Sequence, residues 1–314
     1  MTAYIIRRIL LVIPILFIVA VTTFFITNVI PGDPVRLILG DFASEIQVAQ
    51  LRSELGWDKP LYVRFFLWVT RLLRGDLGQS LFLHVPVTQA IYTRMEPTIV
   101  LAILGQTIAV LIGIPLGVLA ASNHRRILDQ IAVFLAIGGV SIPSFWLAIS
   151  LMLLFSVTLG WFPVAGYQSI GEAGFSSLRY LVLPSISIGV MQSALLARIT
   201  RSAMLDVLTQ DYVRTAKAKG LQRYRILGKH ALRNASIPIV TILGSSFSQL
   251  LAGTWIIETV YSIPGTGALA ITAIMRRDYP LIQGSIIFIA LIYVLINLVI
   301  DISYALLDPR VKME

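Results

Sequence analysis

The sequence predicts an all-helical integral membrane protein with six transmembrane helices and a large external loop after the first of them. Hydrophobic residues make up 57% of the 314 residues and charged residues only 13%, whereas soluble globular proteins average about 45–50% and about 25%. Six stretches with at most one charged residue come close to or exceed the roughly 20 apolar residues that a helix needs to cross a bilayer. These stretches are 9–30, 98–121, 131–159, 181–197, 238–257 and 285–307.

The first stretch, 9–30, follows Arg7 and Arg8, as the apolar core of a secretory signal peptide would. It is, however, much longer than the usual core of about 7–15 residues, and no small-x-small cleavage site follows it. We therefore expect a retained helix rather than a cleaved signal.

The external loop, 31–97, contains two segments that predict structure of their own. Ser44 and Gln47 stand at the spacing of a helix capping box. The apolar side of this helix is expected to consist of Ile46, Val48, Leu51 and Leu55. Such a segment is typical of a small lid packed on the bundle, with direct ligand contact as the alternative. The second segment, 61–73, mixes aromatic residues with two arginines, and we expect it to lie at the membrane interface.

Two of the later spans depart from a simple straight helix. The third, 131–159, is longer than a crossing requires and carries two glycines and Pro143, which predicts a kinked or tilted helix. The fourth, 181–197, is short and has Pro184 in its first turn. We expect both to cross the membrane.

The distribution of Lys and Arg predicts the orientation, because cytoplasmic loops of membrane proteins carry an excess of basic residues. With both termini in the cytoplasm, the internal segments hold 15 Lys and Arg against 6 acidic residues, including Asp301 near the inner end of the last span. The external segments hold 10 of each sign. The net charge of +9 therefore lies on the cytoplasmic side, and topology explains it without nucleic-acid binding.

The longest internal segment, 198–237, predicts an elbow of two helices. Residues 206–219 have helical spacing, Gly220 is expected to end this helix, and a second short helix is expected at 222–233. Small residues such as Ala216 would let the surface of another protein approach the backbone. Docking of a partner and contact of a basic loop with anionic lipid headgroups are both consistent with these residues.

The chain lacks the residues that several classes of chemistry require. The chain has no cysteine, which excludes disulfides, thiolate nucleophiles and cysteine-ligated metal centres. His84, His124 and His230 fall in three different non-membrane segments, and neither HExxH nor the GxxxxGK[ST] phosphate loop occurs. Charged residues are scarce within the spans, which disfavours a proton-coupled carrier. We expect no catalytic residue, no metal and no cofactor on this chain.

The internal elbow contains the string DYVRTAKAKGL at 211–221, followed by HALRNA at 230–235 and Ile-Pro at 237–238. Further strings are IPGDP at 30–34, LGWDKPLYV at 55–63, GDLGQS at 75–80, RRDYPLIQG at 276–284 and DPR at 308–310. Together they cover nearly the whole chain. They resemble binding-protein-dependent ABC importer permeases, in particular the dipeptide permeases of the dipeptide, oligopeptide and nickel branch.

This resemblance implies a type I ABC importer permease fold in the bacterial inner membrane. Residues 1–97 would form the first helix with its periplasmic loop, and residues 98–314 a five-helix transmembrane domain that carries the coupling loop. The implied partners are a second homologous permease, two ABC ATPases that bind ATP and Mg²⁺, a periplasmic or lipoprotein substrate-binding protein, and membrane lipid. The expected cargo is a di- or oligopeptide, with nickel, a metal chelate or glutathione as alternatives.

The resemblance also assigns contact with the ATPases to the coupling motif. Arg214 and Thr215 stand where the general form has Glu and Ala, and Gly220 is further from Pro238 than usual, as is typical of the peptide and nickel branch. The expected coupling residues are Asp211, Tyr212, Arg214, Thr215, Ala216, Ala218, Lys219, Gly220 and Leu221.

Uncharged polar residues of the spans are candidates to line the translocation path. A path with few charges suits varied peptides, although such side chains also commonly join neighbouring helices in lipid. The candidates are Gln106, Ser141, Ser144, Gln192, Ser193, Ser245, Ser248, Gln249 and Asn297.

Overall fold

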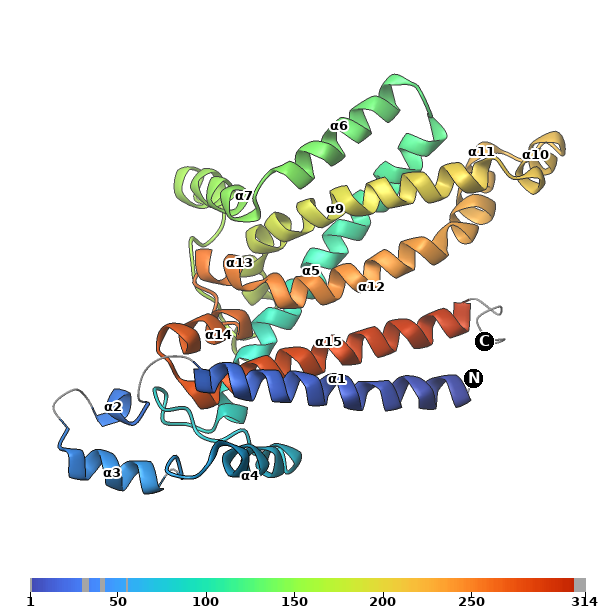
Figure 1. Cartoon of the computed structure of the whole chain (residues 1–314). Coiled ribbons are helices and arrows are strands. Elements are labelled where there is room, and N and C mark those ends of the chain that lie inside the picture. The colour runs from blue at the N-terminus through green and yellow to red at the C-terminus, as the bar shows by residue number, and fades with distance from the viewer. Residues whose placement is uncertain (1, 30–33, 40–42, 55, 308–314) are drawn as a thin grey trace.

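The computed structural model describes residues 2–29, 34–39, 43–54 and 56–307, which form an all-helical structure (Figure 1). The predicted all-helical class is therefore confirmed for this part of the chain. The elements in order are α1 Thr2–Val29, α2 Pro34–Leu39, α3 Glu45–Glu54, α4 Leu61–Leu73, α5 Val87–Ser122, α6 Ile127–Ser141, α7 Ser144–Leu151, η1 Met152–Thr158, α8 Ile170–Ala173, η2 Gly174–Ser177, α9 Leu178–Leu208, α10 Asp211–Ala218, α11 Arg223–Arg225, η3 Ile226–Leu232, α12 Ser236–Gly253, α13 Trp255–Val260, α14 Thr266–Met275 and α15 Tyr279–Leu307.

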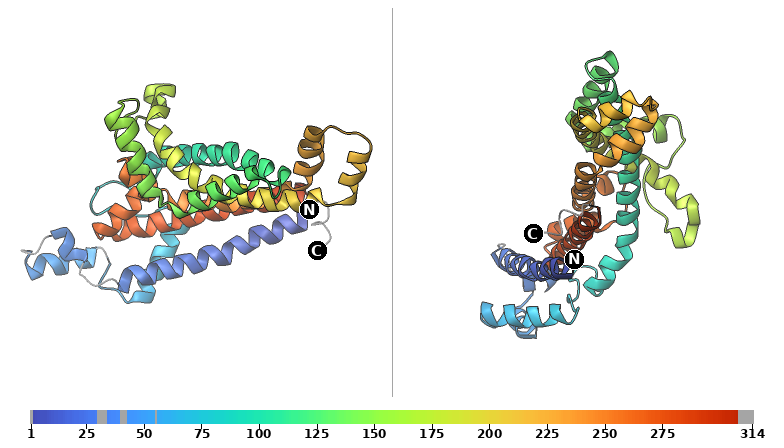
Figure 2. Two further views of the ribbon diagram at one scale, coloured as in Figure 1. Left: turned by 90° about the horizontal axis from the view of Figure 1, so that it is seen from above. Right: turned by 90° about the vertical axis from the view of Figure 1, so that its right-hand side faces the viewer.

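The long helices α1, α5, α9, α12 and α15 form the body of the molecule (Figures 1 and 2). α1 packs chiefly on α15, whereas α12 packs on α5, α9 and α15. α1 begins and α15 ends at the end of the bundle where α9 leads into α10 (Figure 1). We call this the α10 end and the opposite one, where α2 and α3 lie, the α3 end.

The contact between α5 and α9 is the most extensive between helices of the described chain. Small residues bring the two backbones together. A Cβ atom added at Gly113 would lie 2.7 Å from the carbonyl oxygen of Ser193, and one added at Gly117 would lie 2.7 Å from that of Ala197. Close approach through glycine is the usual way for transmembrane helices to pack, since lipid supplies no hydrophobic force between them.

In the described part of the chain, four helices are long and apolar enough to cross a membrane: Arg7–Asn28, Val87–Ser122, Ile170–Leu208 and Tyr279–Ile300. A fifth span results if α6 and the α7–η1 segment are counted as one bent helix. The remaining predicted span, 238–257, coincides with α12 and α13. The apolar part of α12, Ser236–Leu251, is shorter than each of the four spans above. Length and composition therefore support four or five of the six predicted spans.

Several predicted boundaries differ from the helices observed. α5 begins at Val87, well before residue 98. The predicted span began too late because the charged residues Arg94 and Glu96 interrupt the apolar sequence, although both lie within the helix. The fourth span is not short, since α9 runs unbroken from Leu178 to Leu208 with Pro184 inside it. Residue 30, the predicted end of the first span, lies outside the described residues.

The predicted kink in the third span is a sharp break. α6 ends at Ser141 and the next helix begins at Ser144, and the two segments meet at 96°. Pro143 lies between them with an extended backbone (ψ 134°) and caps α7. A proline has no N–H to donate and disfavours a helical conformation in the residue before it, so the first segment ends there.

The capping box predicted before α3 is confirmed. The N–H of Gln47 donates to Ser44 Oγ at 3.3 Å, and the N–H of Ser44 donates to Gln47 Oε1 at 3.0 Å. The predicted apolar side is wrong at Ile46, which is 79% exposed while Val48 is buried. Residues two apart on a helix point in different directions, which the prediction disregarded. Leu55 lies outside the described residues.

α4 crosses the direction of the transmembrane helices. In the right-hand view of Figure 2, α1 is seen end-on whereas α4 lies lengthwise. Two aromatic contacts join the helices: the ring centroid of Phe24 lies 5.3 Å from that of Phe65 and 5.6 Å from that of Trp68. α4 buries none of its residues fully and exposes Tyr62 and Phe66. This arrangement matches the predicted interfacial helix.

Candidate coupling elbow and translocation face

The elbow at the α10 end is shorter than the sequence predicts. The expected helix over 206–219 is two helices, because α9 continues to Leu208 and α10 begins only at Asp211. Gln210 separates them with an extended backbone (ψ 149°) and accepts hydrogen bonds from Val213 and Arg214 through its carbonyl oxygen. The second predicted helix, 222–233, consists of α11 and the π-helical turn η3.

Gly220 ends α10 as predicted. Its backbone φ is +73°, in the left-handed region that glycine adopts without steric cost. The N–H of Gly220 donates to the carbonyl of Lys217 at 3.0 Å, and the N–H of Leu221 donates to that of Ala216 at 3.2 Å. This pair of bonds is a Schellman motif, which satisfies the last carbonyls of the helix and reverses the chain.

Ala216 does not offer an open surface to another protein, contrary to the sequence interpretation. Only 7% of it is exposed, and it packs with Val213 and Ile226 in a small apolar cluster between α10 and η3. Leu221 completes this cluster from beyond the turn. The small side chain at 216 therefore lets the two arms of the elbow pack together.

The other candidate coupling residues lie mainly on the outer side of the elbow. Asp211 is 95% exposed and Arg214 is 76% exposed, with 3.4 Å between Asp211 Oδ1 and Arg214 Nη1. Tyr212 Oη accepts a hydrogen bond from Asn234 Nδ2 at 2.8 Å, which ties α10 to the segment between η3 and α12. Thr215, Ala218 and Lys219 are also exposed, and Leu221 is partly exposed. The elbow thus presents a charged outer surface in which small and large side chains are mixed.

An ion pair fixes the turn between α5 and α6 to α9, just inside the elbow. Arg201 Nε donates to Asp129 Oδ1 at 2.6 Å and Arg201 Nη2 donates to Oδ2 at 2.8 Å, so the pair is bidentate. The N–H of Arg125 donates to Asp129 Oδ2 at 2.9 Å, and His124 Nδ1 lies 3.3 Å from the same oxygen. Asp129 is buried, and bidentate Arg–carboxylate pairs are geometrically specific. The pair therefore makes α6 and α9 one unit.

The structure does not gather the path candidates in one cavity. Ser141 borders a cavity of about 360 Å³ between α5, α6 and α9. Gln106 accepts a hydrogen bond from Ser246 at 3.4 Å and so joins α5 to α12. Ser193 and Asn297 donate to carbonyls of their own helices, and Gln192 and Ser144 are partly buried.

Two of the path candidates do share a face. Ser245 and Gln249 are exposed on α12, and Thr241, one turn earlier, is exposed on the same side. The exposed residues of α15, in contrast, are apolar where they project outward, as at Leu291, Leu295 and Val299. A polar stripe on a helix of this kind indicates contact with water or a protein partner rather than with lipid. We call Thr241, Ser245 and Gln249 the α12 stripe; Thr241 was missed, although its four-residue spacing was visible in the sequence.

A buried carboxylate at the α3 end was also missed. Glu258 on α13 is 0% exposed. Its Oε1 accepts hydrogen bonds from Thr98 Oγ1 at 2.6 Å and Thr254 Oγ1 at 3.0 Å, and its Oε2 accepts one from the N–H of Ala268 at 2.8 Å. Ala268 lies in the first turn of α14, where the helix dipole favours negative charge. A side chain on Gly265 would overlap this carboxyl group, so Glu258 ties α5, α13 and α14 together.

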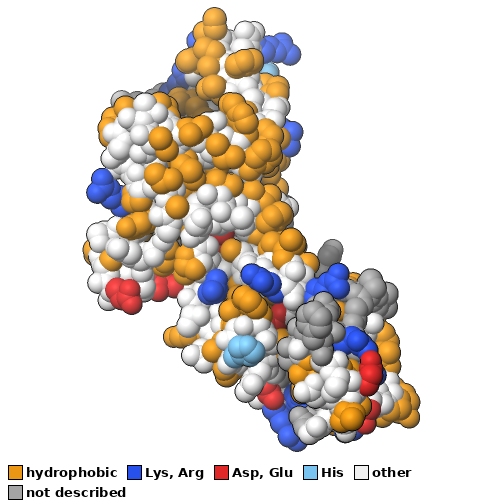
Figure 3. All heavy atoms as spheres, turned by 90° about the vertical axis from the view of Figure 1, so that its left-hand side faces the viewer, with side chains coloured by type: hydrophobic (Ala, Val, Ile, Leu, Met, Phe, Trp, Pro, Cys, Tyr) orange, Lys and Arg blue, Asp and Glu red, His pale blue; other side chains and the backbone are white. Residues whose placement is uncertain are grey.

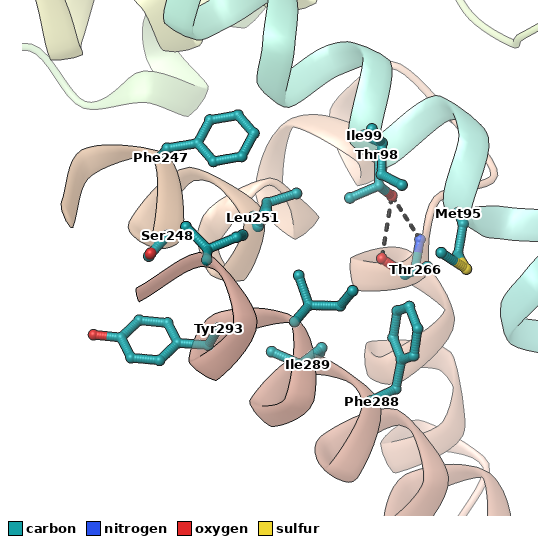
Figure 4. Close-up of a pocket in the computed structure, with 12 residues that line it drawn as sticks. Met95, Thr98, Ile99, Phe247, Ser248, Leu251, Thr266, Phe288, Ile289 and Tyr293 are labelled. Carbon is teal, nitrogen blue, oxygen red and sulfur yellow. Dashed lines mark hydrogen bonds between the residues drawn. The ribbon is translucent and has the colours of Figure 1, made fainter. Parts of the chain in front are cut away.

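An apolar cavity of about 220 Å³ lies next to this cluster, between α5, α12, α14 and α15. Figure 4 shows Thr98 at its wall, where the Thr98 hydroxyl accepts hydrogen bonds from the N–H of Thr266 at 2.8 Å and from its hydroxyl at 3.2 Å. The remaining wall is almost entirely hydrophobic. It is formed by Met95, Ile99, Phe247, Ser248, Leu251, Phe288, Ile289, Ile292, Tyr293 and Ile296.

Two further carboxylates fasten loops at the α3 end. Glu96 accepts hydrogen bonds from Tyr167 Oη at 2.9 Å and from the N–H of Ile170 at 2.6 Å. Burial, and then the neighbouring Glu96 carboxylate, raise the pKa of Tyr167 above its usual value, so this hydroxyl stays a donor. Asp278 accepts hydrogen bonds from Ser80 Oγ at 2.5 Å and from the N–H of Phe82 at 3.0 Å, which pins the loop before α5 to the start of α15.

The histidines take separate positions in the structure. His124 belongs to the Asp129 ion-pair cluster at the α10 end, whereas His84 lies in the loop before α5. Within the described residues, no group of three or more His, Asp or Glu side chains is placed to hold a metal ion.

Comparisons with known proteins cover the whole chain. Residues 113–313 match the family model described as "Binding-protein-dependent transport system inner membrane component", and residues 1–102 match the model of the N-terminal part of such membrane components. A putative peptide transport system permease protein of Brucella abortus is 45% identical over 314 residues, 100% of both chains. A probable peptide ABC transporter permease protein of Sinorhizobium fredii is 42% identical over 99% of this chain and 100% of its own. A glutathione transport system permease protein of Salmonella typhi is 41% identical over 100% of both.

Solved structures show the same fold at low sequence identity. A chain of the methionine ABC transporter MetNI, in an inward-facing conformation, matches with a TM-score of 0.60 at 16% identity, and the match covers 70% of this chain and 97% of that one. A second crystal form of that transporter matches with a TM-score of 0.56 at 16% identity over the same shares.

Proposed function

The chain belongs to the family of binding-protein-dependent transport system inner membrane components, and from this premise we propose that it is one of two permease subunits of an ATP-driven importer of di- or oligopeptides. It is the membrane component and not the ATPase. The observation that carries the mechanism is the elbow at the α10 end, which is packed onto the bundle through Val213 and Ala216 while its charged side remains exposed.

The elbow is the proposed contact with the ATPase subunits. When two ATPases close on ATP, the exposed side of α10 moves with them, and the cluster around Ala216 transmits this motion to η3 and α12. The bidentate pair between Arg201 and Asp129 transmits it to α6 as well. A displacement at the elbow is thereby converted into a rearrangement of packed helices, which is how small interface movements become large conformational changes.

The proposed topology places the α10 end in the cytoplasm. This agrees with the excess of basic residues in the internal segments and puts both termini inside. α12 with α13 would supply the sixth span, so that all six predicted helices cross the membrane. We also propose that residues 1–97 form a peripheral unit on the five-helix domain of 98–314, which suits the packing of α1 chiefly on α15.

The proposed translocation path runs along the α12 stripe, at the interface with the second permease. Ser245 and Gln249 supply uncharged hydrogen-bonding groups there, and Thr241 extends the stripe toward the cytoplasm. Groups of this kind interact with a peptide backbone without selecting its side chains. Substrate choice would then belong to the external binding protein.

Peptides are favoured because relatives at 42–45% identity over essentially the full length are named peptide permeases. Glutathione, itself a small peptide, is the second candidate, because a relative at 41% identity is named for it. Nickel or a metal chelate remains a weaker alternative from the resemblance of the sequence.

The test is uptake by the reconstituted complex. The chain would be purified with a second permease, two ATPases and a binding protein of the same importer, and placed in proteoliposomes. We expect ATP-dependent uptake of labelled di- or oligopeptides, no uptake by this chain alone, and little uptake of Ni²⁺. Transport by the isolated chain without ATP would refute the proposal, and ATP-dependent uptake of Ni²⁺ but not of peptide would refute its substrate.

A further inference from the structure

A cavity of about 400 Å³ opens at the α3 end, between the last turns of α1, the helix α4 and the start of α15. Its walls differ from those of the apolar cavity beside Glu258, because they combine aromatic rings with basic and amide groups. The aromatic residues include Phe24, Trp57 and Trp68, and the basic ones are Lys59, Arg64 and Arg71.

The cavity carries an excess of positive charge. The lining contains the basic residues Lys59, Arg64 and Arg71 and the acidic residue Asp76. The Asp76 carboxylate already accepts a hydrogen bond from the N–H of Gly78 at 2.8 Å. Among the described residues, none of the three cations forms an ion pair with a carboxylate. Of the three, Arg64 is partly buried whereas Lys59 and Arg71 are exposed. A partly buried cation without an acidic partner favours an anionic ligand, since burial penalises an uncompensated charge.

Arg64 is held in place for such a ligand. Its guanidinium carbon lies 4.9 Å from the centroid of the Trp57 ring, which is within the range of a cation–π contact. Burial lowers the pKa of Arg64 relative to its usual value, but an arginine stays charged in proteins. The planar guanidinium with its fork of N–H donors suits the oxygens of a phosphate group.

The position of the cavity indicates where this anion comes from. α4 crosses the direction of α1 (Figure 2) and exposes Tyr62 and Phe66, so it lies in the interface of the leaflet at the α3 end. The surface of α1 beside it is apolar and exposed, as at Ile18 and Phe25. Figure 3 looks onto this end and shows Lys and Arg side chains, with Asp and Glu among them, over its lower part, where α2, α3 and α4 lie. Headgroup phosphates and acyl chains meet at this depth.

We propose that this cavity binds the headgroup of an anionic phospholipid from the leaflet at the α3 end. Arg64 and Arg71 hold the phosphate, Lys59 adds charge at the outer rim, and the acyl chains lie along the apolar surface of α1. The apolar surface next to the basic groups distinguishes a phospholipid from free phosphate, which would gain nothing from it. The lipid would thereby join α4 to α1 and α15.

The test measures retained lipid on the purified complex by native mass spectrometry. Complexes would be taken from nanodiscs of phosphatidylglycerol or phosphatidylcholine, and a parallel sample would receive millimolar inorganic phosphate. The test variant is Arg64→Gln with Arg71→Gln. Arg74→Gln is the matched control, because Arg74 is exposed at the end of the same helix and lies outside the cavity lining.

We expect the unmodified complex to retain phosphatidylglycerol over phosphatidylcholine, and the double variant to lose at least about tenfold in retention, which corresponds to about 1.4 kcal/mol. Arg74→Gln should retain lipid normally. Arg64→Lys with Arg71→Lys should retain more lipid than the glutamine double variant, because it keeps the charge, and less than the unmodified complex, because it loses the guanidinium fork. Equal retention by the double variant and the Arg74 control would overturn the proposal. So would retention of both lipids alike, or displacement of the lipid by inorganic phosphate or by a free peptide.

Discussion

The left-handed turn at Gly220 can be tested by giving that residue a side chain. A Cβ atom at Gly220 would meet no other atom within 4 Å, so the cost of Gly220→Ala comes from its φ of +73° alone. An L-residue in this conformation costs about 1–2 kcal/mol. That free energy changes the ratio of the closed Schellman turn to its opened forms by a factor of about 5–30.

Gly228→Ala is a matched control, because Gly228 lies in the same elbow, is exposed, has open space around it and lacks the positive φ. Gly220→Asn is a second control, since asparagine tolerates the left-handed region better than other L-residues. The assay is the number of peptides imported per ATP hydrolysed by the reconstituted complex. We expect this ratio to fall for Gly220→Ala, by at most the factor of about 5–30, to stay unchanged for Gly228→Ala, and to recover in part for Gly220→Asn.

Equal coupling ratios for Gly220→Ala and Gly228→Ala would refute the reasoning. So would a defect in Gly220→Asn as large as that in Gly220→Ala, because the backbone conformation would then not be the cause.

Ala216→Leu should overpack the cluster within the elbow at a cost of about 1–3 kcal/mol and lower the protection of the elbow amides against hydrogen exchange, while Ala218→Leu, on the exposed side, should leave that protection unchanged; equal protection in the two variants would contradict this. Asp129→Asn should lower the apparent unfolding temperature, since loss of one partner from a largely buried ion pair costs about 3–5 kcal/mol, and Arg201→Gln in the same chain should restore part of the loss; a double variant less stable than Asp129→Asn would count against the pairing. Glu258→Leu should be destabilised more than Glu258→Gln, because leucine leaves two hydroxyls and an N–H without an acceptor at about 1–3 kcal/mol each; the two unfolding temperatures decide, and equal values would contradict the assigned hydrogen bonds.

The sequence predicts where the helices lie better than it predicts the residues at which they begin and end. Apolar composition locates the spans because crossing a bilayer requires it, but α5 continues back to Val87 through Arg94 and Glu96, which a hydropathy search treats as boundaries. Similarly, Pro143 predicts that the helix is kinked but not the angle of the kink. The 96° break depends on how α7 packs against α9 and α13, and that packing is a property of the whole fold.

The coupling elbow shows which features of a site are determined by the local sequence. Gly220 predicts the end of α10 because only its backbone conformation matters there. Ala216, however, was expected to face a partner and instead packs inside the elbow. A small side chain permits close approach from either direction, and only the position of Ile226 on the returning chain decides between them.

The contacts of the buried carboxylates could not be predicted from the sequence, for a different reason. Thr98 and Glu258 are 160 positions apart, and Ser80 and Asp278 are 198 apart. Each of these residues alone is an ordinary polar residue, with nothing in its local sequence to indicate its partner. Their hydrogen bonds exist only because distant helices meet at the α3 end.

The glycine contacts between α5 and α9 determine which parts of the molecule are able to move during transport. Where two backbones touch through Gly113 and Gly117, neither helix has room to slide or rotate past the other without a steric clash. These two helices therefore behave as a single rigid frame through the transport cycle. Alternating access must then arise beside this frame, by tilting of α12 against it. Distances between spin labels on α5 and α9 should stay constant through the cycle, while distances between labels on α9 and α12 should change.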